Sequence, residues 1–207
     1  MQFVYFDMGN VLLRFSHERQ AEQMARVAGS TPARVWQILY EGQSGLHWEF
    51  ERGAIDSEQF LARFCEATGS QPDLRELMQA SNDIFWLNVP IVGLVGHLYA
   101  AGLRLGVFSN TTSDHWDYCL ARFGILPSMF KIHALSCRLR AMKPEAAAYA
   151  GAAQLAGVPP EQIFFTDDAR TTSQGPARPA GTPRCSSRPV NSTNSCAGGG
   201  SRSTIDA

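Results

Sequence analysis

The hydrophobic positions of the chain fall into short apolar runs and longer stretches with helical spacing. Three of the runs are mostly apolar and are followed by polar residues, as expected for strands buried in a parallel sheet. They are Phe3–Phe6, 103–108 and Ile163–Thr166. A weaker run predicts a further strand at Ile132–Leu135. The pattern therefore predicts a parallel sheet.

Between residues 16 and 88, apolar side chains recur at helical spacing, and no strand pattern interrupts them. Each expected helix opens at a residue that favours the N-cap position. These openings are Ser16, Thr31-Pro32, Asp56-Ser57 and 71–73. Beyond residue 90, helices alternate with the strands and are predicted over 91–101, 113–124 (capped by Ser113 or Asp114) and 145–156.

The order of these elements determines the expected fold class. Strands that alternate with helices form parallel sheets with right-handed crossovers. We therefore expect an α/β fold, a doubly wound parallel sheet, built from residues 1–15 and 89–170 with one helical insertion. The insertion, residues 16–88, is predicted to form a helical cap over the active edge of the sheet.

Charge and composition exclude several classes of partner. The formal net charge of -1 argues against nucleic acid and acidic membranes, because both require a basic surface. No apolar stretch approaches the roughly 20 residues of a membrane helix, and the first residues do not resemble a signal peptide. Five cysteines without a CxxC pair are typical of reduced thiols. We expect a cytoplasmic protein that acts on a small molecule, and its oligomeric state stays open.

Residues 171–207 differ in composition from the rest of the chain. They contain no Phe, Tyr, Trp, Leu or Met, and Gly, Pro, Ser and Thr make up 21 of these 37 residues. Such a segment cannot bury enough apolar surface to offset the entropy that it would lose on folding. We predict that the fold lies in residues 1–170 and that the segment after it is a disordered tail.

Polar side chains follow three of the predicted strands directly. They are Asp7, the pair Ser109-Asn110 and the pair Asp167-Asp168, while Lys143 precedes a helix on the same side of the sheet. The carboxyl ends of parallel strands meet at one edge, so these side chains should converge there. Carboxylates hold Mg²⁺, and hydroxyl and ammonium groups hold phosphoryl oxygens. The set therefore suits a metal ion together with a phosphate.

Four short motifs carry these residues: FDMGNVL at 6–12, FSNT at 108–111, AMKP at 141–144 and FFTDD at 164–168. In this order and spacing, the chain resembles the haloacid dehalogenase superfamily, in the subgroup with a helical cap after the first strand. Any one motif alone would be a weak signal, since an Asp and an Asn after a strand are common. The four together cover residues 1–170 and make a strong one.

The resemblance implies a role for each residue. Asp7 would be the nucleophile that forms an aspartyl-phosphate, which water then hydrolyses. Asp7, Asp168 and the backbone carbonyl of Gly9 would bind Mg²⁺, and Asp167 would reach the ion through water. Ser109, Asn110 and Lys143 would contact the substrate, and Ser109 and Lys143 would stabilise the charge on the transferring group. The implied activity is Mg²⁺-dependent hydrolysis of a small phosphorylated metabolite.

One position departs from the family pattern. Most phosphatases of the family carry an Asp two residues after the nucleophile as general acid, and this chain has Gly9 there. General acid catalysis typically contributes about 10²–10⁴-fold, so the proton must come from water, another residue or the substrate. The FDxGNV pattern resembles that of glucose-1-phosphate phosphatases, which implies a sugar phosphate as substrate.

Two alternatives stay open. The 2-haloacid dehalogenases use the same nucleophile without metal, but they usually carry Tyr at the position of Gly9. Adjacent carboxylates at Asp167 and Asp168 would repel each other without a cation, which favours the metal-dependent reaction. The second alternative is a catalytically impaired protein that at most binds phosphate.

The tail supplies the reason for the second alternative. Family members follow the Asp-Asp pair with DDxxxNVxGAxxxG, and this pattern breaks after Asp168. If one base was lost after the codon of Arg170, the code allows 171–177 to be reread as Asp-Asn-Val-Ala-Gly-Ala-Arg, with a strand and a helix beyond. We predict that residues 171–207 are frameshifted and that this strand and helix are missing beside Ile163–Thr166.

We assign no catalytic role to the histidines or to two residues of the cap, Trp48 and Glu49. The five histidines show no metal-ligand spacing, which favours surface or core positions for them. Trp48 and Glu49 lie in the predicted cap, where aromatic side chains more often pack than bind substrate.

Overall fold

A computed structural model describes residues 2–41 and 45–168 of the chain. The predictions for 171–207, disorder and frameshift, lie outside these residues. The described part is an α/β fold around a four-stranded parallel sheet in the order β5-β4-β1-β6. Its strands are β1 (Phe3–Phe6), β4 (Arg104–Ser109), β5 (Ile132–Leu135) and β6 (Ile163–Thr166). The predicted fold class is confirmed.

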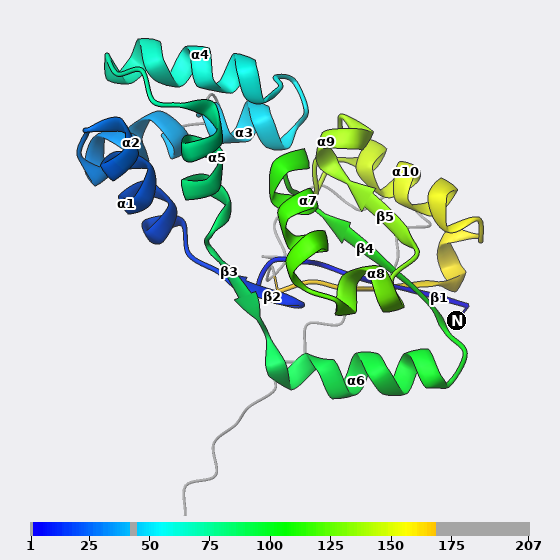
Figure 1. Cartoon of the computed structure of the whole chain (residues 1–207). Coiled ribbons are helices and arrows are strands. Elements are labelled where there is room, and N and C mark those ends of the chain that lie inside the picture. Colours follow the sequence, from blue (N-terminus) through cyan, green and yellow to red (C-terminus); the bar gives the residue numbers. More distant parts are fainter. Residues whose placement is uncertain (1, 42–44, 169–207) are drawn as a thin grey trace, which may run out of the picture.

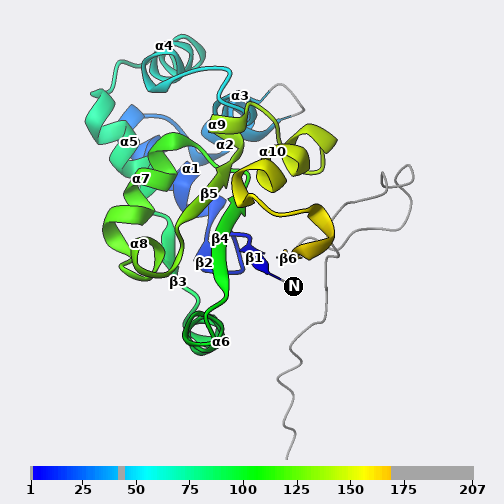
Figure 2. The same ribbon diagram turned by 90° about the vertical axis from the view of Figure 1, so that its right-hand side faces the viewer.

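Helices cover both faces of this sheet (Figure 2). On one face lie α6 (Val89–Ala100), α7 (Ser113–Arg122) and α8 (Ile125–Met129); on the other lies α10 (Ala146–Ala156). Because side chains alternate along a strand, Val4 and Phe6 point into one core cluster while Phe3 and Tyr5 point into the other. Both clusters meet β1, so the central strand that leads to Asp7 is held from both sides.

The predicted helical insertion is present and has a core of its own (Figure 1). It contains α1 (His17–Ala28), α2 (Pro32–Tyr40), α3 (Leu46–Glu51), α4 (Ser57–Thr68) and α5 (Leu74–Asn82). The side chains of Ser16, Thr31, Asp56 and Asp73 accept the N-cap hydrogen bonds of α1, α2, α4 and α5. The local signals that opened these helices in the sequence are therefore the caps that stabilise them.

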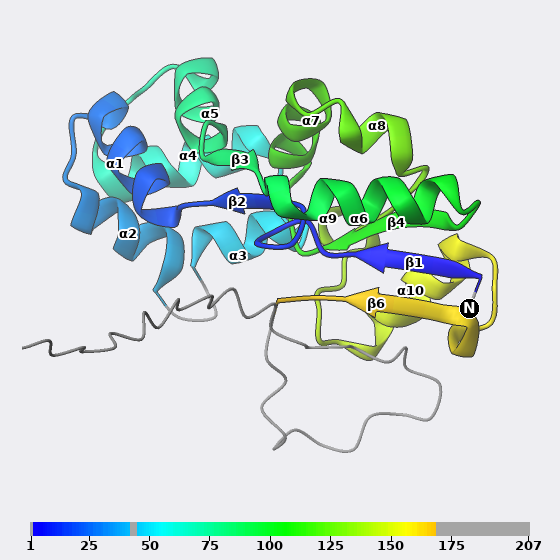
Figure 3. The same cartoon turned by 90° about the horizontal axis from the view of Figure 1, so that it is seen from below.

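A short antiparallel ribbon joins the insertion to the sheet, and the sequence analysis missed it. β2 (Leu13–Phe15) pairs with β3 (Phe85–Leu87) in the register Phe15↔Phe85. The expectation that no strand interrupts 16–88 is therefore wrong at 85–87. Figure 3 shows this ribbon between the insertion and the sheet. Strands this short carry too few residues for alternation to stand out from helical spacing.

Smaller differences concern the ends of elements. Thr112, rather than Ser113 or Asp114, caps α7, because its side chain accepts a hydrogen bond from the amide of His115. The helices α8, α9 (Ser136–Leu139) and the 3₁₀ turn Pro160–Gln162 were not predicted, since each is only about one turn long. No helix of the described residues is both long and apolar enough to cross a membrane.

Candidate active site

Asp7 lies where β1 ends, at the edge of the sheet where the sequence predicted the nucleophile. Its amide donates a hydrogen bond of 2.9 Å to the carbonyl of Thr166, which ties the end of β1 to the end of β6. One carboxylate oxygen, Oδ1, accepts a hydrogen bond of 2.7 Å from the amide of Met8. The side chain is buried, and its second oxygen, Oδ2, faces a partner from another part of the chain.

That partner is Lys143, whose ammonium group lies between two carboxylates. Its Nζ is 3.0 Å from Oδ2 of Asp7 and 2.8 Å from Oδ2 of Asp167, and all three side chains are at most 12% exposed. The ammonium also lies 5.4 Å and 4.9 Å from the ring centroids of Phe108 and Phe165. The rings and carboxylates together fix the position of this one cation.

The electrostatics of this group follow from its burial. Burial raises the pKa of Asp7 from 3.8 to about 6; the charge of Lys143 opposes this shift, and that of Asp167 adds to it. Burial alone would lower the pKa of Lys143, but Asp7 and Asp167 more than offset it, so the net shift is upward. Lys143 therefore stays charged at neutral pH.

Three carboxylates at this edge can bind a divalent cation. Asp7, Asp167 and Asp168 each offer an oxygen, and these oxygens all lie within 4.8 Å of one another. Oxygen ligands of this kind are those that Mg²⁺ prefers. Asp168 is exposed, so the cluster opens to solvent on its side. The three carboxylates outnumber the one ammonium, which leaves negative charge for a cation to balance.

Ser109 and Asn110, at the end of β4, lie at the same edge of the sheet and make different contacts there. Ser109 is buried; its hydroxyl donates a hydrogen bond of 3.3 Å to the carbonyl of Asn110, and its nearness to the carboxylate of Asp7 helps to lower the pKa of that group. Asn110 instead holds the backbone of Lys143: its Nδ2 donates to the carbonyl (3.0 Å) and its Oδ1 accepts from the amide (2.8 Å). The structure thus brings all the predicted side chains together and gives Asn110 a positioning contact.

Gly9 leaves no room for a side chain in the present arrangement. A Cβ atom added there would lie 2.8 Å from Cε1 of Phe15, a distance that real Cβ atoms do not reach. Phe15 is held in place by the ribbon, where it pairs with Phe85. The position two residues after Asp7 is therefore closed by an aromatic ring, in agreement with the absence of an acidic side chain at this position.

A comparison with protein-family models identifies the family of this chain. The family model for haloacid dehalogenase-like hydrolases matches residues 1–175. The chain is a haloacid dehalogenase-like hydrolase. No curated protein matches it.

Solved structures of haloacid dehalogenase-like hydrolases share the fold. A family enzyme of Bacteroides thetaiotaomicron, in complex with magnesium and inorganic phosphate, is 21% identical, with a TM-score of 0.70 over 82% of this chain and 85% of that one. The L-2-haloacid dehalogenase of Xanthobacter autotrophicus with chloropropionic acid covalently bound is also 21% identical, with a TM-score of 0.57 over 80% and 69% of the two chains. A subfamily IA hydrolase of Geobacter sulfurreducens is 17% identical, with a TM-score of 0.52 over 82% and 79%.

The hydrolase carries a second polar cluster that sequence reasoning missed. His47 and Glu51 of α3 lie against His115 of α7 and His17 of α1, with 3.4 Å between His47 Nε2 and Glu51 Oε1. The ring of His47 is 5.6 Å from that of His115 and 5.7 Å from that of His17. These residues come from three helices, so no spacing along the chain could have revealed them.

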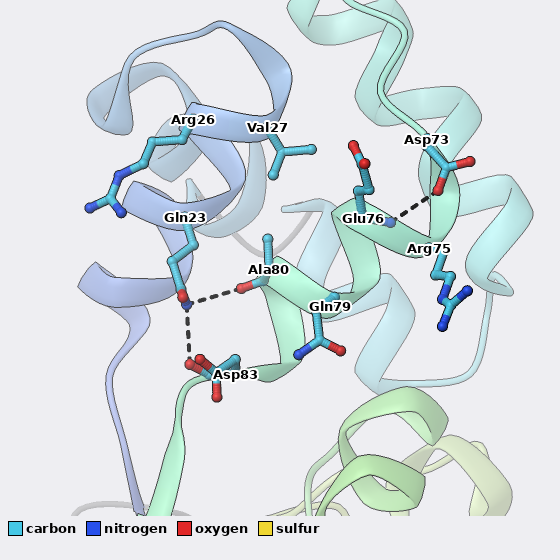
Figure 4. A pocket seen from close by; sticks show the side chains of 9 residues that line it. All are labelled: Gln23, Arg26, Val27, Asp73, Arg75, Glu76, Gln79, Ala80 and Asp83. Atoms are coloured by element: carbon cyan, nitrogen blue, oxygen red, sulfur yellow. Dashed lines mark hydrogen bonds between the residues drawn. The ribbon is translucent and has the colours of Figure 1, made fainter.

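A hollow on the insertion lies apart from both clusters. Figure 4 shows it between α1 and α5, where Gln23 donates hydrogen bonds to the carbonyls of Ala80 and Asp83. Charged and polar side chains line most of it, and none of the predicted site residues takes part: Gln23, Arg26, Val27, Asp73, Arg75, Glu76, Gln79, Ala80 and Asp83. It adds nothing to the predicted chemistry.

Proposed function

We propose that this chain is a Mg²⁺-dependent phosphomonoester hydrolase that acts on a small phosphorylated metabolite through an aspartyl-phosphate at Asp7. The observation that carries the proposal is the cluster of Asp7, Asp167 and Asp168, the first two of which pair with one buried ammonium. Nucleophile, cation ligands and phosphoryl-binding groups then stand within reach of one phosphorus atom. The magnesium and phosphate in the Bacteroides thetaiotaomicron relative support the same assignment.

The reaction takes place in two displacements. A carboxylate oxygen of Asp7 attacks phosphorus and forms a P–O bond, while the bond from phosphorus to the ester oxygen breaks and its electron pair leaves with the alcohol. Water then attacks the phosphorus of the aspartyl-phosphate, releases inorganic phosphate and restores the carboxylate. Lys143 and Ser109 hold the phosphoryl oxygens, and they stabilise the charge that the transition state spreads over them.

Mg²⁺, held by Asp7, Asp168 and the carbonyl of Gly9, with Asp167 through water, would supply positive charge next to the phosphoryl group. Asp7 is poised for this arrangement because the amide of Met8 and the ammonium of Lys143 fix its carboxylate. Asn110 serves the same site by holding the backbone of Lys143.

Gly9 has no side chain that could protonate the leaving oxygen. With Phe15 against Gly9, the proton comes from water, the substrate or another side chain. The FDxGNV pattern favours a sugar phosphate as the metabolite. We further propose a cytoplasmic location, in keeping with the free thiols of Cys65, Cys119 and Cys137.

Phosphate release from p-nitrophenyl phosphate tests the proposal. The full chain should turn over with Mg²⁺ and stop in EDTA, and Asp7→Asn should lose at least about 10³-fold, since removal of a covalent nucleophile costs this much or more. Asp117→Asn, an exposed carboxylate on α7, is the matched control and should keep full activity.

Each contrary result favours a different alternative. Full phosphate release in EDTA would exclude the metal-dependent reaction. Halide release from 2-chloropropionate in EDTA would identify a dehalogenase instead. No release above the Asp7→Asn background would leave an impaired protein.

A further inference from the structure

We propose that Arg52 is a positioning residue: through Glu145, it lets the helical insertion hold the Lys143 segment in place. The inference rests on the proposed function only in that Lys143 serves phosphoryl transfer. The contact itself is a property of the fold. It is formed where the end of α3 meets the residues that precede α10.

Three consecutive residues of the insertion dock on the core. The carbonyl of Glu51 accepts a hydrogen bond of 2.6 Å from Ser136 Oγ, and the side chain of Arg52 pairs with Glu145. A Cβ atom on Gly53 would lie 2.2 Å from the carbonyl oxygen of Cys137. Only a glycine permits this close approach at a φ of +71°. The turn 51–53 is therefore fitted closely to the core surface.

The Arg52–Glu145 pair has the geometry of a strong ion pair. Nη1 of Arg52 donates to Oε1 of Glu145, and Nη2 donates to Oε2 over 3.1 Å, which is the two-point fork that arginine makes with carboxylates. The guanidinium carbon lies 5.1 Å from the ring centroid of Trp48. The fork and the ring fix both the position and the plane of the guanidinium, which a lysine could not reproduce.

Glu145 connects this pair to Lys143. It is the N-cap residue of α10, and its amide donates 2.7 Å to the carbonyl of Met142, closing a tight turn around Lys143. On the core side, the side chain of Asn110 makes two hydrogen bonds to the backbone of Lys143. The turn that carries the catalytic ammonium therefore has one anchor in the core and one in the insertion.

Two anchors on opposite sides have a consequence for catalysis. The placement of a catalytic group within about 0.5 Å is worth a large part of the rate, and it depends on the residues that support it. With the insertion seated, Arg52 completes the support of the 142–145 turn. Without that contact, the turn would be restrained from the core side only, by Asn110 and by the ion pairs that Lys143 makes, and Lys143 would be placed less closely against the phosphoryl group.

Hydrogen exchange of the full chain tests this without relying on activity. In Arg52→Ala, amide hydrogens of peptides over 142–148 should exchange about fivefold faster than in the wild type. This factor corresponds to the upper end of the stabilisation that partly exposed ion pairs provide. Arg63→Ala is the matched control, because Arg63 binds Glu49 with two 2.8 Å hydrogen bonds inside the insertion. Its exchange at 142–148 should equal that of the wild type. The charge-swapped double variant Arg52→Glu, Glu145→Arg should recover at least about half of the protection that the pair provides.

Kinetics gives the second readout. Arg52→Ala should lower kcat for p-nitrophenyl phosphate about tenfold with a smaller change in KM, because a group that acts in the transition state loses its placement. Arg52→Lys should recover only part of this loss. Unchanged exchange in Arg52→Ala, equal acceleration in Arg63→Ala, or no recovery in the swapped pair would each overturn the proposal. Faster exchange in Arg52→Ala alone, in a chain that hydrolyses no monoester, would support the positioning contact and contradict the proposed function.

Discussion

Two clusters of mostly buried charged and polar side chains lie close to the boundary between sheet and insertion, and they have opposite compositions. At the sheet edge, one ammonium pairs with two carboxylates, and a third carboxylate, Asp168, lies beside them. Between insertion and core, one carboxylate, Glu51, lies among three imidazoles. Both contain acids and bases in contact, so burial of polar groups alone does not distinguish them.

Their charge at neutral pH does distinguish them. Lys143 stays protonated because two carboxylates more than offset its burial. Burial lowers the pKa of His115 to about 3 and that of His17 to about 4, so both imidazoles are neutral. The pKa of Glu51 would rise with burial, but His47 and its neighbours hold it below the usual value. The sheet-edge cluster thus retains excess negative charge that a cation can balance. The second cluster, with two neutral imidazoles, lies between the insertion and the core and joins them.

The largest expected effect comes from a substitution that disrupts only the sheet-edge cluster. Asp168→Ala should reduce Mg²⁺-dependent turnover by more than the roughly 10–100-fold that loss of an outer-shell partner costs, because in the proposed mechanism Asp168 binds the ion directly. The melting temperature should barely change, because Asp168 is exposed. Phosphate release against Mg²⁺ concentration, with thermal melts, measures both.

Glu161→Ala is the control for this substitution, since Glu161 is an exposed carboxylate on the same segment. It should retain wild-type Mg²⁺ dependence. Wild-type turnover in Asp168→Ala would show that the cluster does not hold the ion.

The same two clusters show how far sequence reasoning reaches. The runs that end at Asp7, Ser109 and Asp167 are local signals, and the rule that parallel strands present their carboxyl ends at one edge brings them together. The N-caps of the insertion are local as well. Local signals and one topological rule were therefore enough for most of the fold and for the candidate site.

What sequence reasoning missed depends on contacts between distant elements. The ribbon of β2 and β3 is too short to show a period. His17, His47 and His115 come from three helices, and Arg52 meets Glu145 only once the insertion is docked. Such contacts are set by packing, and no spacing along the chain encodes them.

A pair of glycine substitutions tests how tightly the insertion is seated beside the second cluster. Gly53 and Gly69 both have positive φ, +71° and +73°, but a Cβ on Gly69 would meet nothing within 4 Å. Gly69→Ala should cost about 1 kcal/mol for the backbone conformation alone. Gly53→Ala adds a clash with the backbone of Cys137 and should cost about 2–4 kcal/mol. Thermal melts should separate the two variants, and equal losses would show that the turn 51–53 moves away freely.

The smallest effect concerns the protonation of the second cluster. Because the pKa of His115 is about 3 in the folded chain and about 6.5 when unfolded, only the unfolded chain takes up this proton as the pH falls below 6.5. The stability due to the neutral imidazole is therefore complete above pH 6.5 and declines by about 1.4 kcal/mol per pH unit below it. Between pH 6.5 and 5, this amounts to about 2 kcal/mol. Glu51 does not contribute in that window, since its pKa is lowered from 4.5.

His115→Gln keeps a donor for the carbonyl of Ser81 and removes the titration. Between pH 6.5 and 5, the melting temperature of the wild type should fall further than that of the variant. The difference between the two falls should be about 4–8 °C, at 2–4 °C per kcal/mol. The titration of Asp7 is common to both proteins and cancels in this difference. His97→Gln, at an exposed position on α6, should follow the wild type. If all three curves are parallel, protonation of His115 is not coupled to unfolding, and the neutral imidazole at the boundary between insertion and core would no longer distinguish this cluster from the sheet edge.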